Sequence, residues 1–195
     1  METAIGFRIR APCHMTGTAM PATSLDTTPD TAMVDAARNG DGEAFGYLYA
    51  AYAKMVHGIL MARVPPDEVD DLVQDVFLAA FRKVHTLRDA AAFGPWLAMI
   101  ARNRANDFHR HKPETAELPE DIVAADRTEA EAAAILALIQ TLPDAYRETL
   151  VLRLVEGMTG PEIAERTGLT VASVRVNLHR GMKQLREKLG GGRHE

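Results

Sequence analysis

Cysteine is almost absent from this sequence, since Cys13 is the only one among 195 residues. A single thiol cannot form an internal disulfide, and it excludes a metal site built from several cysteines. A chain without disulfides is typical of a reducing compartment, so we expect a cytoplasmic protein. The sequence has no apolar run of about 18 residues, which predicts no membrane insertion. No apolar stretch follows Arg8 and Arg10, which argues against a secretory signal.

The sequence also lacks the motifs of common enzymes. It contains no glycine-rich phosphate loop, no HExxH zinc motif and no motif of an activated serine or cysteine nucleophile. His109 and His111 are two residues apart on an expected helix and face different ways, so the seven histidines give no ligand set. Asp70, Asp71 and Asp75 have no second acidic helix with which to hold magnesium. We therefore expect no enzyme activity, no catalytic residues, no metal and no cofactor.

Aromatic residues make up only 6% of the chain, and no segment shows the alternation of a β-strand. The apolar spacing instead predicts an all-α fold with two small helical domains. The first domain is expected over residues 31–111 and the second over 128–189, joined by an acidic flexible linker over 112–127. Residues 1–30 are expected to be a disordered extension and 190–195 a tail. Helices are predicted near residues 31–38, 42–61, 66–84, 95–111 and 144–155.

Residues 159–189 have the pattern of a helix-turn-helix. Thr159 and Glu162 have the spacing of a capping box, which predicts that a helix begins near residue 160. Gly168 supplies the residue that ends this helix and turns the chain tightly. Thr170 or Ser173 can then cap a second helix. The apolar positions of the second helix recur every three or four residues and are expected to face inward. They are Val171, Val174, Leu178, Met182, Leu185 and Leu189.

The charge of the chain is distributed unevenly. Residues 170–188 contain five Lys or Arg and one Glu, whereas the whole chain has a net charge of −5. A protein that bound DNA mainly through overall positive charge would be basic, because its affinity grows with the number of phosphates that it neutralises. We therefore expect weak DNA binding by the chain alone, assisted by a larger partner.

Two blocks of sequence narrow the function further. Residues 70–77 (DDLVQDVF) and 93–103 (FGPWLAMIARN) resemble the region 2 motifs of bacterial RNA polymerase sigma factors. The later LP at 142–143, EG at 156–157, EIA at 162–164 and HR at 179–180 resemble region 4 of the same family. Their order and the absence of a middle domain resemble the extracytoplasmic-function (ECF) group. The resemblance covers residues 35–189 and implies a sigma factor that binds core RNA polymerase, directs promoter-specific transcription initiation and is controlled by an anti-sigma factor.

The resemblance also implies three sets of functional residues. The set that binds core polymerase is Asp70, Asp71, Leu72, Gln74, Asp75 and Phe77. The set that binds melted minus-10 promoter DNA is Arg88, Arg102, Asn103, Arg104, Asn106 and Arg110. The set that binds the minus-35 duplex is Ser173, Arg175, Asn177, His179, Arg180 and Lys183. Four positions depart from the common pattern of region 4, so the promoter element that this chain reads can be unusual. They are Val176, Asn177, Gly181 and Met182.

Other readings of these residues remain open. Acidic helix faces are usually solvated, and Asn103 can be an ordinary surface residue. Trp96 is expected to pack in the core rather than to stack on a base. The alternative function is a dimeric helix-turn-helix regulator whose N-terminal helices bind a ligand or a partner. Such a regulator would need neither the acidic helix nor the block over residues 96–103.

Overall fold

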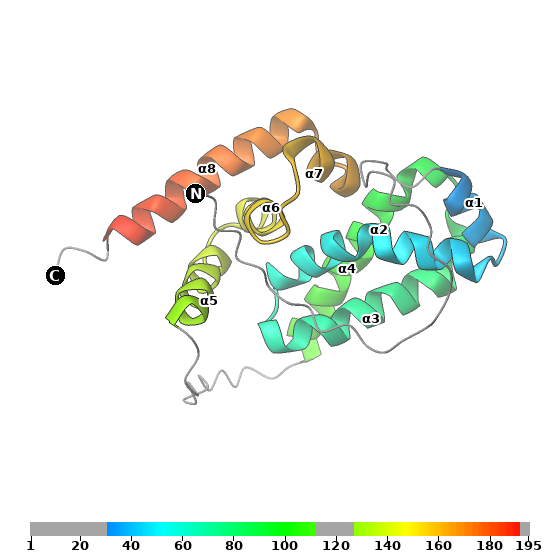
Figure 1. Cartoon of the computed structure of the whole chain (residues 1–195), viewed down its shortest axis with the longest axis horizontal. Helices are drawn as coiled ribbons and strands as arrows, with labels where there is room; N and C mark the ends of the chain where they lie inside the picture. The colour runs from blue at the N-terminus through cyan, green and yellow to red at the C-terminus, as the bar shows by residue number, and fades with distance from the viewer. Residues whose placement is uncertain (1–30, 112–126, 192–195) are drawn as a thin grey trace.

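The computed structural model describes residues 31–111 and 127–191 (Figure 1). The expected N-terminal extension, the linker up to residue 126 and residues 192–195 lie outside the described residues. Within them the structure is helical and has no strand, which confirms the predicted all-α fold. No helix in these two ranges has the length and apolarity needed to cross a bilayer. The elements are α1 (Thr31–Arg38), α2 (Gly42–Met61), α3 (Pro66–Lys83), η1 (Val84–Thr86), η2 (Ala90–Ala92), α4 (Phe93–His111), α5 (Arg127–Gln140), α6 (Asp144–Leu154), α7 (Gly160–Thr167) and α8 (Val171–Gly191).

The N-terminal domain, residues 31–111, is a bundle of α1 to α4 (Figure 1). The carboxylate of Asp41 caps α2 by accepting the backbone N–H groups of Glu43 and Ala44 at 2.9 and 3.1 Å. On α3, the side chains of Leu72, Val76 and Ala80 are buried and face the bundle. The 3₁₀ turns η1 and η2 between α3 and α4 were not predicted, because single turns leave no periodic pattern.

The C-terminal domain, residues 127–191, contains the predicted helix-turn-helix in α7 and α8. The capping box is present: the Thr159 hydroxyl accepts the Glu162 N–H, and the Glu162 carboxylate accepts the Thr159 N–H. Gly168 ends α7 with a left-handed φ of 77°, a conformation that glycine adopts without a steric penalty. The Thr170 hydroxyl accepts the N–H of Ser173 at 3.0 Å, so Thr170 rather than Ser173 caps α8.

The predicted inward stripe of α8 is correct in the middle and wrong at the ends. Val174 and Leu185 are buried, and Leu178 and Met182 are partly buried. Val171 and Leu189 are instead 56% and 45% exposed. The physical reason is that α6 packs against the central part of α8, while the C-terminal part of α8 extends away from the molecule (Figure 1).

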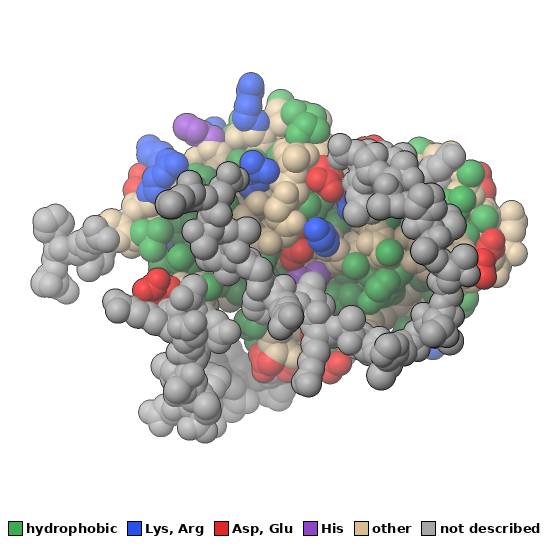
Figure 2. Space-filling model, in the orientation of Figure 1, with side chains coloured by type: hydrophobic (Ala, Val, Ile, Leu, Met, Phe, Trp, Pro, Cys, Tyr) green, Lys and Arg blue, Asp and Glu red, His purple; other side chains and the backbone are tan. Residues whose placement is uncertain are grey.

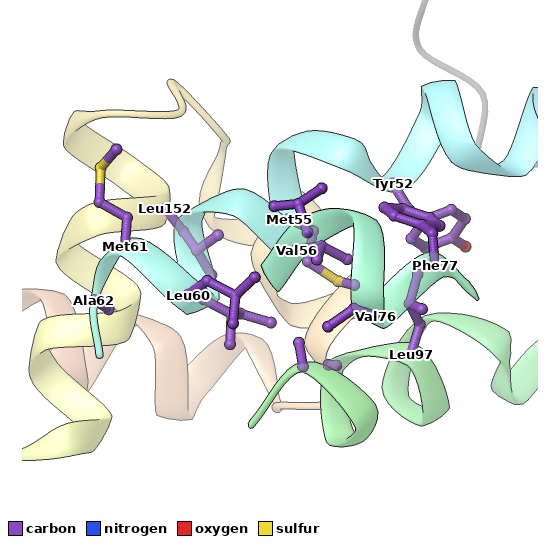
Figure 3. Packing of buried hydrophobic residues seen from close by; sticks show 14 of the residues in the cluster. Tyr52, Met55, Val56, Leu60, Met61, Ala62, Val76, Phe77, Leu97 and Leu152 are labelled. Atoms are coloured by element: carbon purple, nitrogen blue, oxygen red, sulfur yellow. The ribbon is translucent and has the colours of Figure 1, made fainter. Parts of the chain in front are cut away.

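The two domains share a continuous apolar core. Helix α6 packs against α2, and α7 packs against α4 (Figure 1). Leu152 of α6 is fully buried and lies beside the α2 side chains that include Leu60 (Figure 3). The Gln140 amide at the end of α5 donates to the Met61 carbonyl at 2.9 Å. The domains are therefore docked on each other, which the prediction of two domains on a flexible linker did not include.

Candidate nucleic-acid and polymerase interfaces

Helix α8 carries all of the residues expected to bind duplex DNA. Ser173, Arg175, His179, Arg180 and Lys183 are exposed, and Asn177 is half-buried. Basic side chains gather along this helix on the face shown in Figure 2. Arg175, Val176, His179 and Arg180 are neighbours on this side of the helix, one turn apart. The structure thus places the whole predicted set on one helix, although the Ser173 hydroxyl lies 2.8 Å from that of Thr170 at the cap.

Gly181 explains how α8 is held with this side outward. Its backbone lies so close to α6 that an added Cβ would be 3.0 Å from Leu150 Cδ1 and 3.2 Å from Tyr146 Cβ. Glycine lowers the stability of a helix interior by about 1 kcal/mol relative to alanine. Glycine at this position allows α8 to pack closely on α6, which offsets that loss. The residue that departs from the family pattern is therefore a contact residue between the two helices.

Helix α4 carries a second polar surface, and its residues differ in what they contact. Asn103 and Asn106 are exposed. Arg104 is exposed but forms an ion pair with Asp75 of α3. Arg110 is exposed and lies 3.0 Å from Asp107 on its own helix. Arg88 is exposed in the segment before η2. Trp96 is half-buried against the core, with its ring 5.8 Å from that of Phe93, which supports the packing role expected for it.

The residues expected to bind polymerase divide into two groups. Asp70, Asp71 and Gln74 are exposed on one side of α3, and Asp75 is half-buried beside Arg104. Leu72 and Phe77 are only 7% and 4% exposed, which corrects their assignment as contact residues. Their side chains hold α3 in the bundle. The motif identifies the helix but does not say which of its residues face the solvent.

The structure adds an apolar surface that sequence reasoning missed. Leu78 and Phe81 of α3 are 53% and 49% exposed, and Tyr49 of α2 is 42% exposed. The Phe81 ring lies 5.0 Å from the ring of Phe45, so its apolar surface continues from the core. The signal was present in the spacing, since residues 74, 78 and 81 fall on one face of a helix. The acidic face of α3 therefore continues into an exposed apolar face.

Arg102 is the member of the minus-10 set that contacts the other domain. Its Nη2 and Nε donate to the two carboxylate oxygens of Glu148 on α6, at 2.7 and 3.1 Å. Arg63 donates to the same carboxylate at 2.8 Å. Burial disfavours the charged form of Glu148, but the hydrogen bonds and charges of Arg102 and Arg63 outweigh it and hold the pKa of this carboxyl below its usual value. Glu148 and Arg63 were not identified from the sequence, because no local pattern links residues so far apart.

Two further polar contacts join the domains. His57 Nδ1 of α2 lies 2.6 Å from the Glu156 carboxylate that follows α6. This hydrogen bond outweighs the opposing effect of burial and raises the pKa of His57 above its usual value. The guanidinium of Arg166 donates to the Ala51 carbonyl and lies 5.4 Å from the ring centroid of Tyr52. Among the described residues, no cluster of three or more histidine, cysteine or acidic side chains could hold a metal ion.

Comparison with known proteins identifies both domains. Residues 48–113 match the model of Sigma-70 region 2, and residues 132–185 match that of Sigma-70, region 4. The RNA polymerase sigma factor CarQ of Myxococcus xanthus is 33% identical over 162 residues, covering 78% of this chain and 93% of CarQ. The ECF RNA polymerase sigma-E factor of Haemophilus influenzae is 28% identical over 179 residues, covering 82% and 95% of the two chains.

A solved structure agrees with this assignment. The structure of CnrH in complex with the cytosolic domain of CnrY matches with a TM-score of 0.61 and 27% identity, over 84% of this chain and 99% of that chain. The two matched regions follow the order expected from the sequence, and the second contains the helix-turn-helix of α7 and α8. A sigma factor directs transcription initiation, which decides against the alternative of a plain dimeric regulator. The chain belongs to the sigma-70 family of RNA polymerase sigma factors, in its ECF group.

Proposed function

We propose that this sigma factor reads the minus-35 duplex with α8. The observation that carries this assignment is the exposed set of Arg175, His179, Arg180 and Lys183 on one helix of a helix-turn-helix. The second helix of this motif enters the major groove, where arginine can bond the edge of a guanine or hold a phosphate. The helix is supported from behind by its packing on α6, so its polar face is presented without rearrangement within the C-terminal domain.

The exposed part of α4 is proposed to bind the melted minus-10 strand. Asn103 and Asn106 are exposed amides three residues apart on one helix, and amides can donate to and accept from a base edge at the same time. Arg88, Arg104 and Arg110 supply charge for the backbone of the strand. Arg102 belongs to the same surface, provided that its bond to Glu148 is released.

The exposed face of α3 is proposed to bind core polymerase. Asp70 and Asp71 give this face negative charge that would repel nucleic acid, and Leu78 and Phe81 add exposed apolar area. A mixed apolar and acidic face is suited to a protein partner rather than to DNA. Leu78 and Phe81 therefore replace the buried Leu72 and Phe77 in the proposed contact set.

A second protein is proposed to control access to this surface. The resemblance to ECF sigma factors implies an anti-sigma factor, and the similar CnrH structure contains the cytosolic domain of CnrY as a bound partner. An anti-sigma factor that covered the α3 face would exclude polymerase. We further propose that the chain acts in the cytoplasm, where it would meet core polymerase and promoter DNA.

In-vitro transcription with bacterial core polymerase and a genomic promoter library tests these assignments. Asn103→Ala and Arg180→Ala should each weaken initiation at the promoters that the wild type selects. Arg186→Ala is the matched control, because it removes an exposed arginine from α8 outside the proposed set. Leu78→Ala with Phe81→Ala should reduce binding to core polymerase in a pull-down assay. Equal initiation by Arg180→Ala and the wild type would refute the minus-35 assignment.

A further inference from the structure

Val176 is an apolar side chain in the middle of the polar side of α8. It is 42% exposed, whereas Val174 is buried and Leu178 is partly buried. Positions two residues apart lie on nearly opposite sides of a helix, because 3.6 residues make one turn. Arg180 follows Val176 by about one turn and is also exposed. Val176 therefore lies at the centre of the surface that is proposed to enter the major groove.

The fold of α8 gives no reason for a valine at this position. An exposed side chain contributes little to packing, and valine is a weaker helix former than alanine because its branched Cβ restricts χ1. The same restriction is useful at an interface. A valine in a helix keeps one preferred χ1 rotamer, so its two methyl groups are held in position before any contact forms. Where the chain departs from the common region 4 pattern, it therefore presents a rigid apolar contact.

Thymine is the base that presents an apolar group in the major groove. Adenine, cytosine and guanine show hydrogen-bond donors and acceptors there, whereas thymine adds a C5-methyl group to its acceptor. The Val176 side chain has no polar atom. Against a polar base edge it would displace water without supplying a hydrogen bond, which is unfavourable. Against the thymine methyl group it would remove apolar surface of both partners from water, which is favourable.

We propose that Val176 contacts the C5-methyl group of a thymine in the minus-35 element, and that this contact makes the chain specific for thymine at that base pair. The inference deepens the proposed function and rests on it, since it requires α8 to lie in the major groove. Side chains one helical turn apart have Cβ atoms about 5–6 Å apart, and base pairs follow each other every 3.4 Å or so, roughly. The thymine should therefore lie about one or two base pairs from the group that Arg180 contacts.

Deoxyuridine substitution tests this contact, because it removes only the methyl group of thymine and keeps the base pair. Each thymine of a minus-35 element selected from the promoter library is replaced in turn. Fluorescence anisotropy then measures binding of the DNA to core polymerase assembled with this chain. Wild-type affinity should fall about fourfold at one thymine, the effect of losing one buried methyl group. In Val176→Ala the same deoxyuridine should change the affinity by less than about twofold, because the methyl group has already lost its partner.

Two controls separate the contact from general effects on binding. Val171→Ala removes a valine that is 56% exposed at the first position of α8, on a different side of the helix from Val176. This variant should keep the full sensitivity to deoxyuridine. A deoxyuridine between the minus-35 and minus-10 elements should leave wild-type affinity unchanged. Val176→Ala should fold, since it replaces an exposed residue with the strongest helix former.

The outcomes distinguish this inference from the proposed function. One thymine that is sensitive in the wild type and in Val171→Ala, but not in Val176→Ala, supports the contact. An element without a sensitive thymine, or sensitivity that Val176→Ala retains, overturns it. If Arg180→Ala loses promoter affinity while no thymine is sensitive, α8 binds the duplex and only the valine contact is wrong. If Arg180→Ala and Val176→Ala both bind like the wild type, the minus-35 assignment and this inference fail together.

Discussion

Helices α4 and α8, the two proposed DNA-binding helices, differ in the partners of their arginines. On α4, each of the three arginines is bonded to a carboxylate: Arg102 to Glu148, Arg104 to Asp75 and Arg110 to Asp107. On α8, no carboxylate of the described residues lies within ion-pair distance of Arg175 or Arg180. Carboxylates therefore hold all three arginines of α4, whereas Arg175 and Arg180 of α8 could bind a phosphate without first breaking an ion pair.

Removal of the apolar contact between the domains should have the largest effect on this comparison. Leu152 is fully buried, and Leu→Ala substitutions at such positions cost about 2–5 kcal/mol. Leu152→Ala should lower the unfolding free energy by an amount in this range and release α4 from the C-terminal domain. Chemical denaturation followed by circular dichroism measures the loss. Leu154→Ala is the matched control on the same helix, because Leu154 is 50% exposed and its truncation should cost about 0.5 kcal/mol or less.

A free arginine and a paired one should differ in their contribution to DNA binding. If Arg180 contacts a base, Arg180→Ala should weaken binding to promoter DNA in the polymerase complex by about 1–3 kcal/mol. If Arg180 contacts a phosphate instead, the salt dependence of the binding constant should fall by the equivalent of about one phosphate contact. Arg104→Ala should reduce the affinity for DNA by less, because Arg104 must break its ion pair with Asp75 before it can bind DNA. Fluorescence anisotropy with fork-junction promoter DNA at several salt concentrations measures both. A larger loss from Arg104→Ala than from Arg180→Ala would contradict the view that α8 is the prepared surface.

The start of α8 offers a smaller test of the same surface. Thr170→Ala removes the hydroxyl that accepts the Ser173 N–H, and loss of a helix cap costs about 1 kcal/mol. The first turn of α8, which carries Ser173, should fray, and binding to the minus-35 duplex should weaken without a change in domain docking. Thr159→Ala, which removes the equivalent cap of α7, is the control for a cap lost away from the proposed DNA face. An equal loss of duplex binding from both substitutions would mean that the first turn of α8 does not contact the duplex.

These contrasts also show what the sequence could and could not predict. The ends of α7 followed from Thr159, Glu162 and Gly168, because capping and left-handed turns are local and depend on particular side chains. The burial of Phe77 was missed, because a family motif names residues without giving their faces. The bond between Arg102 and Glu148 was beyond prediction from the sequence. It joins residues 46 positions apart, and only the docking of two domains brings them together.

The smallest effect is expected from pH, and it acts on docking while leaving α8 unchanged. The hydrogen bond that His57 donates to the Glu156 carboxylate raises the pKa of His57 above its usual value in the docked form, with Asp70 adding a weaker effect of the same sign. A raised pKa means that protonation favours docking. This contribution is fully present below the ordinary histidine pKa of about 6.5 and is lost as the pH rises through the higher value of the docked form. The free energy of unfolding, measured by chemical denaturation, should therefore decrease between pH 6 and pH 8, and His57→Gln should flatten this change. A profile that His57→Gln does not alter would assign the pH dependence to another group.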